Sequence, residues 1–87
     1  MIIQVTKADI RAGICGDCHN CPVAQAIAND LKVSHDDIFV AADHIKVLSV
    51  VYPTPVRVRR FIRKFDGGDK VEPFAFHLRR REQRAAA

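Results

Sequence analysis

Three evenly spaced cysteines, Cys15-x-x-Cys18-x-x-Cys21, constrain the fold of this chain more than any other feature of its sequence. They are the only cysteines in the chain, and Pro22 follows the last of them directly. This spacing places three thiols on one short loop. Proline suits the first turn of a helix, because its missing N–H would have no partner there. We therefore expect a tight cysteine loop that leads straight into a helix.

The chemistry of this loop has four interpretations, which the sequence leaves open. The thiols can act as small apolar groups that fill space at a helix entrance. They can bind zinc through Cys15, Cys18 and Cys21, with His19 as the fourth ligand, or another histidine in its place. They can hold three corners of an iron–sulfur cluster, although the closing cysteine of a ferredoxin is missing. A C-x-x-C pair at a helix N-terminus can also perform redox chemistry, because the helix dipole stabilises a thiolate.

The apolar patterning of the rest of the chain predicts an α+β fold. Alternation over 1–5 predicts a strand, and Thr6 with Asp9 predicts a capping pair for a short helix that ends at Gly13. Helices are expected over 22–32 and 54–66, and further strands over 37–41, 45–52 and 71–78. The main elements then follow the order β-α-β-β-α-β, which is typical of a ferredoxin-like antiparallel sheet with two helices.

Length and composition indicate one small domain. The 87 residues suit a single core, which we expect over 1–78, followed by a basic tail over 79–87 that frays. Hydrophobic residues make up 48% of the chain, which argues against wholesale disorder. No apolar run is long enough to span a bilayer, and the first residues do not resemble a signal peptide. We therefore expect a cytoplasmic protein that does not enter a membrane.

The charge is divided unevenly along the chain. Residues 1–44 carry a net charge of −3, whereas residues 45–87 carry eleven basic and four acidic side chains, a net of +7. Eight of the nine arginines lie after residue 56, and arginine favours bidentate contact with phosphate or carboxylate. This division predicts an acidic partner, of which nucleic acid is the most common kind. A solvated polar face is the alternative interpretation.

The helix expected over 54–66 is strongly two-faced. Val58, Phe61, Ile62 and Phe65 form an apolar stripe at helical spacing, and five cations lie on the opposite half of the helix. Together with the tail, the predicted binding residues are Arg57, Arg59, Arg60, Arg63, Lys64, Arg79, Arg80 and Arg81. The nearby aromatic residues Phe74 and Phe76 are interpreted mainly as core, with base stacking as the alternative.

The remaining polar residues favour structural roles. His35, Asp36 and Asp37, like Asp43 and His44, stand in an order that predicts turns and caps. The sequence has no glycine-rich phosphate loop, nucleophile elbow or paired carboxylate array. Thiol redox chemistry is thus the only enzymatic activity with any support, and we expect a protein that is not an enzyme.

Short motifs spread over most of the chain give it a family likeness. They are Val5-Thr6-x-x-Asp9-Ile10-x-x-Gly13, Cys18-x-x-Cys21-Pro22-Val23-Ala24, Phe65-Asp66-x-Gly68 and Glu72-Pro73-Phe74. In these motifs the chain resembles small uncharacterised proteins of actinobacterial phages and prophages. The resemblance implies a phage setting and a location in the host cytoplasm. It implies no activity, so no catalytic residue is carried over, and Cys15 lies outside the shared motifs.

These observations predict a non-enzymatic, phage-type accessory module that binds nucleic acid or another acidic surface through its basic helix, without a cofactor. In this interpretation the Cys18/Cys21 loop braces the fold. A protein-binding inhibitor of a host or defence factor is the first alternative. A small metal-binding or thiol redox protein, with zinc or an iron–sulfur cluster at the loop, is the second.

Overall fold

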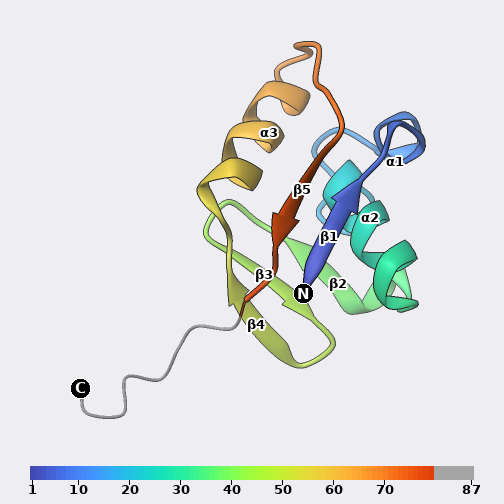
Figure 1. The fold of residues 1–87 in the computed structure, drawn as a ribbon, viewed down its shortest axis with the longest axis vertical. Coiled ribbons are helices and arrows are strands. Elements are labelled where there is room, and N and C mark those ends of the chain that lie inside the picture. The colour runs from blue at the N-terminus through green and yellow to red at the C-terminus, as the bar shows by residue number, and fades with distance from the viewer. Residues whose placement is uncertain (80–87) are drawn as a thin grey trace.

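The α+β class predicted from the sequence is confirmed by the computed structural model, which describes residues 1–79 (Figure 1). Within that range the elements are β1 (Ile2–Val5), α1 (Lys7–Ala12), α2 (Pro22–Leu31), a 3₁₀ helix (His35–Asp37), β2 (Ile38–Val40), β3 (His44–Val47), β4 (Val50–Pro53), α3 (Val56–Asp66) and β5 (Phe74–His77). Most of the tail that the sequence predicted to fray lies outside the described residues.

The five strands form two antiparallel sheets. β1 pairs with β5, so that Ile3 lies opposite Phe76, and β2, β3 and β4 form a separate meander. The prediction of one sheet was therefore wrong, and the ferredoxin-like arrangement stays a prediction. The β1–β5 pair joins the two ends of the described chain, which brings the segment before β5 next to α1.

The segment 45–52, predicted as one strand, is a hairpin. β3 ends at Val47 and β4 begins at Val50, with Leu48 in the left-handed conformation at φ 57°. Two-residue hairpin turns need a positive φ, for which glycine is the usual residue. The sequence has leucine there, and the run of apolar residues on both sides concealed the turn.

The first helix begins as the sequence predicted. The Thr6 hydroxyl accepts a hydrogen bond from the Asp9 N–H, and the Asp9 carboxylate accepts one from the Thr6 N–H at 2.9 Å, which completes a capping box. Asp9 is also buried, and its second oxygen accepts a hydrogen bond from Asn29 of α2 at 2.7 Å. One carboxylate therefore caps α1 and fixes it to α2.

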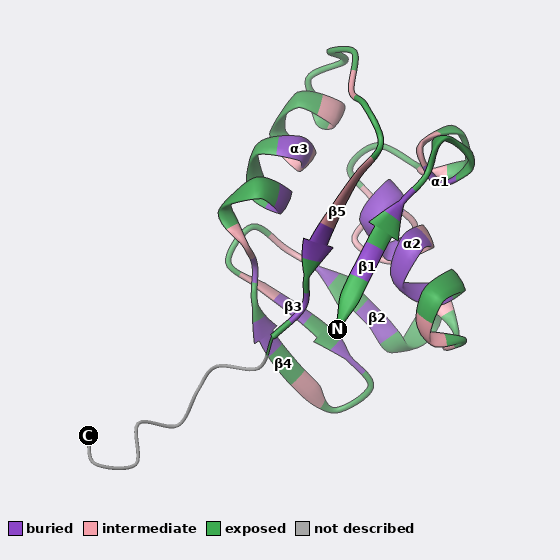
Figure 2. Cartoon of the chain, viewed as in Figure 1, coloured by how far each residue is buried: buried purple, intermediate pink, exposed green. Residues whose placement is uncertain are grey.

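The α2 helix is buried along most of its length (Figure 2). Ala24, Ala26 and Ala28 lie among its buried residues, and because alanine adds little bulk, this helix packs closely against β1 and β2. Gly13 lies where the cysteine loop begins, and the close approach of Pro22 leaves no room for a side chain there. A methyl group at this position would lie 2.4 Å from the Pro22 ring.

The α3 helix lies beside β5 and is exposed along its outer face (Figures 1 and 2). It begins two residues later than predicted, with Pro55 as its N-cap. Val58 and Phe61 are buried, and Ile62 and Phe65 are partly buried, which confirms the predicted apolar stripe. The main core is built from Ile3, Val5, Val23, Ile27, Ile38, Val40, Ile45, Val47, Tyr52, Val58, Phe61, Phe76 and Leu78.

Candidate functional site

The five cations of α3 are all exposed, as the helical spacing predicted. They are Arg57, Arg59, Arg60, Arg63 and Lys64. Within residues 1–79 none of them pairs with a carboxylate, because the one ion pair there joins His44 to Asp43. The acid at the end of the helix, Asp66, uses its carboxylate to accept a hydrogen bond from the Gly16 N–H at 3.1 Å. Within the described part of the chain, the basic face of α3 therefore has no carboxylate in ion-pair contact.

Arg57 connects the helix to the neighbouring strand. Its Nη1 donates a hydrogen bond to the Ala75 carbonyl of β5 at 3.2 Å. A guanidinium group has five N–H donors, so most of them are left for other acceptors. The contact therefore positions the charge beside β5 without neutralising it.

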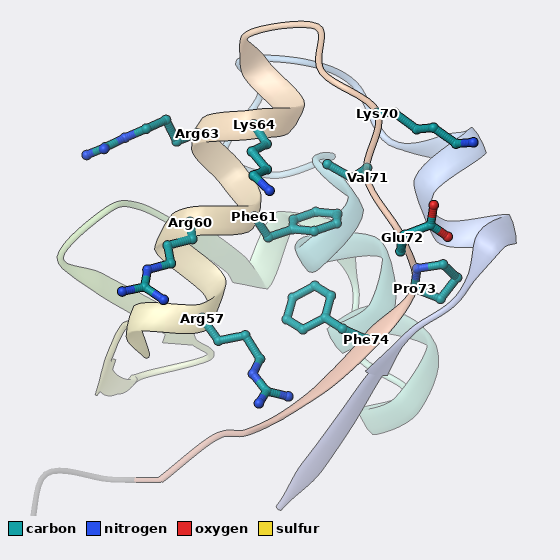
Figure 3. Close-up of a pocket in the computed structure, with 10 residues that line it drawn as sticks. All are labelled: Arg57, Arg60, Phe61, Arg63, Lys64, Lys70, Val71, Glu72, Pro73 and Phe74. Atoms are coloured by element: carbon teal, nitrogen blue, oxygen red, sulfur yellow. The ribbon is translucent and has the colours of Figure 1, made fainter.

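A pocket of about 470 Å³ lies between α3 and the segment 70–74 (Figure 3). Cations from both sides line it, with Glu72 as the single acid; the residues are Arg57, Arg60, Phe61, Arg63, Lys64, Lys70, Val71, Glu72, Pro73 and Phe74. Arg59 is not among them. Pockets of roughly 300–1,000 Å³ are the usual size for small-molecule sites. The pocket thus combines a cationic rim with an apolar interior.

Aromatic rings make up much of the apolar interior. The rings of Phe61 and Phe74 lie with centroids 4.7 Å apart, and Figure 3 shows both facing the space between α3 and β5. The ring centroids of Phe74 and Phe76 lie 5.8 Å apart. The Phe65 ring is stacked on Phe61, with centroids 6.2 Å apart. Phe76 is buried, as predicted for a core residue, whereas Phe74 is only partly buried.

A second hollow of about 300 Å³ adjoins the first across the segment 70–73. It is lined by Lys7 and Arg11 of α1, and it shares Lys70, Val71, Glu72 and Pro73 with the first pocket. We call the seven cations of the two hollows the cationic track: Lys7, Arg11, Arg57, Arg60, Arg63, Lys64 and Lys70. Lys7, Arg11 and Lys70 were missed by the sequence analysis, because only the pairing of β1 with β5 brings them to this side.

Two of the predicted tail residues lie outside the described part of the chain. Arg79 is described and exposed, whereas Arg80 and Arg81 are not among the described residues. Their predicted role in binding therefore stays a prediction.

The cysteine loop is held by hydrogen bonds to its own backbone and to α3. Asp17 Oδ1 accepts bonds from the backbone N–H groups of His19 at 2.9 Å and Asn20 at 3.1 Å. These bonds, the one from His19 above all, hold the pKa of Asp17 below its usual range. The Cys15 thiol donates to the Asp66 carbonyl at 3.4 Å, and the Cys18 carbonyl accepts from the Val40 N–H at 2.9 Å. The loop thus connects α3 to β2.

The three thiols lie in different surroundings. Cys15 is exposed, Cys18 is partly buried, and Cys21 is buried in the core as the N-cap of α2. Burial raises the pKa of the Cys21 thiol, although backbone N–H groups of α2 act in the opposite direction. Partial desolvation and the neighbouring Asp66 also raise the pKa of the Cys15 thiol. These directions are opposite to those expected of a reactive thiolate.

The predicted ligand set is not assembled into a cluster. Among residues 1–79 no group of three or more histidine, cysteine or acidic side chains is placed to hold a metal ion. The His19 ring turns toward β2, with Nδ1 2.6 Å from the Ile38 carbonyl oxygen and its edge against Phe39. Zinc and iron–sulfur binding at Cys15, Cys18, Cys21 and His19 therefore stay predictions.

Most of the other polar residues have the turn and cap positions that the sequence predicted, but His44 is the first residue of β3. His35, Asp36 and Asp37 form the 3₁₀ turn before β2. Asp43 lies in the turn between β2 and β3, where the neighbouring His44 ring, 2.8 Å away, lowers its pKa.

Comparison of the chain with protein-family models, with curated proteins and with solved structures gives no significant match. The resemblance to phage proteins, and the host cytoplasm that it implies, thus stay predictions. Within residues 1–79 the structure contains no helix that is both long and apolar enough to cross a membrane.

Proposed function

We propose that this protein is a non-enzymatic nucleic-acid-binding module, which contacts the phosphate backbone through the cationic track. The observation that carries the proposal is the absence of carboxylate partners for the cations of α3 among the described residues, together with the position of four of these five cations around one pocket. Cations that serve only solubility are usually interspersed with acids. Here a single acid, Glu72, lines both hollows.

The stability of α3 itself supports a ligand of opposite charge. Arg59 and Arg63, like Arg60 and Lys64, are four residues apart on the helix. Like charges at this spacing destabilise a helix by roughly 0.2–0.5 kcal/mol per pair. A helix that retains such like-charge pairs gives up some of its own stability, and such departures from local stability are expected at functional sites. Phosphates bound along the track would relieve this repulsion.

The shape of the track favours a linear polyanion. Its cations come from α1, α3 and the segment before β5, and they line two adjoining hollows instead of one compact spot. A phosphate backbone carries a regular series of charges that can follow such a line with little sequence preference.

In this proposal the cysteine loop has the bracing role expected from the sequence. Gly16 and Cys15 contact Asp66 at the end of α3, and Cys18 contacts β2 through its backbone. The loop then fixes the orientation of α3 relative to the sheet, and its thiols need no reactivity.

Fluorescence anisotropy with labelled DNA and RNA 12-mers, single-stranded and duplex, tests the proposal at low salt. Wild type should bind, and the Arg60→Gln/Arg63→Gln double variant should bind more weakly. Lys46→Gln is the matched control, because Lys46 is an exposed cation on β3 outside the track. Polyglutamate of matched charge should compete poorly. No binding of any nucleic acid would overturn the proposal, and equal binding of polyglutamate would point to an acidic protein as the partner.

A further inference from the structure

We infer that the pocket between α3 and the segment 70–74 accepts one unpaired base of a single-stranded nucleic acid, stacked against the Phe61 and Phe74 rings. This inference rests on the proposed function and adds to it a preference for single strands. It uses the one feature of the site that phosphate binding leaves unexplained, which is the apolar interior of a pocket surrounded by cations.

The composition of the pocket defines the chemistry of its occupant. A neutral apolar ligand would leave Arg60, Arg63 and Lys64 without partners, and an anion without an apolar part would leave the partly exposed Phe74 ring uncovered. A nucleotide unit satisfies both, because it carries a flat aromatic base beside a negatively charged phosphate. Every base has a π-face, so stacking on aromatic side chains is tolerant of sequence.

A duplex does not fit the pocket in the same way. Its bases are already paired and stacked, and a base has to leave the stack before a pocket can take it. A single strand presents its bases without that penalty. The track alone would bind both forms, so the pocket is what should distinguish a single strand from a duplex.

The two hollows also give the strand a path. They share Lys70 and the segment up to Pro73, with Lys7 and Arg11 on the far side. A base seated against Phe61 and Phe74 therefore leaves the adjoining phosphates next to α3 on one side and to Lys70 on the other. Arg57, held by the Ala75 carbonyl, contributes a positioned donor beside the pocket.

The first test compares two 12-mers of equal charge on the wild-type protein, one of thymidine and one of abasic spacers. If a base occupies the pocket, the abasic strand should bind more weakly by roughly 5- to 150-fold, the range of one stacked base. Equal affinity of the two strands would overturn the inference while leaving the proposed function intact. Binding of neither strand would contradict the proposed function itself.

A tryptophan reporter locates the base, since the chain contains no tryptophan. Phe74→Trp should show fluorescence quenching with the thymidine strand and little with the abasic strand at saturation. Val51→Trp, at an exposed site on β4, is the control and should respond to neither. Equal responses of Phe74→Trp to both strands would count against a base in the pocket.

Two matched variants on α3 separate the pocket from general charge. Arg60 lines the pocket and Arg59 does not, although each is an exposed arginine of the same helix. Arg60→Gln should reduce the preference for single strand over duplex, whereas Arg59→Gln should leave that preference unchanged. The inference is wrong if the two variants have the same effect on that preference.

Discussion

The salt dependence of binding gives the sharpest quantitative prediction for the cationic track. For a single strand, the logarithm of the affinity falls with the logarithm of salt concentration by roughly 0.7 for each phosphate contacted. If each of the seven cations of the track contacts one phosphate, the slope is about −4.9. Affinity should then fall roughly 900-fold between 50 and 200 mM salt.

The double variant Arg60→Gln/Arg63→Gln should make that slope shallower. With five contacts left on the track, the slope becomes about −3.5 and the loss over the same salt range about 130-fold. Glutamine keeps good helix propensity, and the change removes like-charge pairs with Arg59, Arg57 and Lys64, so the melting temperature should not fall. A loss of binding through unfolding would thus be visible in the thermal melt.

Fluorescence anisotropy with a labelled single-stranded 12-mer at four or more salt concentrations measures both slopes. Lys46→Gln is again the control, and its slope should equal that of wild type. A double variant that binds more weakly but keeps the wild-type slope would refute the assignment of these arginines to phosphate contacts. A slope near zero for wild type would refute an electrostatic track altogether.

Three further predictions concern the fold that positions the site. Asp9→Ala removes the carboxylate half of the capping box of α1 and the acceptor of the Asn29 amide, so the free energy of unfolding measured in urea should fall by about 1–3 kcal/mol. Unchanged stability would contradict the role of Asp9 as an anchor. Because the folded-state pKa of Asp17 is lowered, its carboxylate stabilises the fold above the unfolded pKa of about 3.9 and loses that contribution as the pH falls. The stability advantage of wild type over Asp17→Asn, measured by urea unfolding, should therefore be full at neutral pH and shrink below about pH 4; an advantage that grows in acid would contradict the sign. Iodoacetamide labelling at neutral pH, followed by mass spectrometry, should modify Cys15 before Cys21, because Cys21 is buried and burial raises its thiol pKa. Rapid labelling of Cys21 would instead support the redox interpretation.

Much of the local structure could be predicted from the sequence because each element carries its own signal. The capping pair of Thr6 and Asp9 marked the start of α1, and Pro22 marked the start of α2. The two-faced pattern of α3 predicted both its buried stripe and its five exposed cations. These signals are local, since they depend on residues within one or two turns of each other.

The rest depends on pairing between distant residues, for which a single sequence has no direct signal. Nothing near Leu48 predicts a positive φ at a leucine, so the β3–β4 hairpin was interpreted as one strand. The pocket exists because the chain segment before β5 lies alongside α3, which brings Phe74 onto Phe61 and places Lys70 near the basic face. Base stacking by Phe74 is an alternative that the sequence offers, but nothing in the sequence identifies Phe61 as its neighbouring ring.

The role of the cysteine loop also depended on distant contacts. The regular spacing suggested metal or redox chemistry, yet the hydrogen bonds that order the loop come from Asp17 and from Asp66 of α3. The thiols of Cys15 and Cys21 have separate surroundings, one exposed and one in the core. A spacing that looks like a ligand set is here compatible with a loop that is ordered by its own polar contacts.

The most direct test of the account is a titration of ¹⁵N-labelled protein with an unlabelled single-stranded 12-mer, followed by NMR. The amide shifts that change should lie in α3, in the segment 70–74 and at Lys7 and Arg11 of α1, while those of β2 and β3 stay in place. Shifts that cluster on the cysteine loop or on the β2–β4 sheet, or a spectrum that does not change at all, would contradict the account.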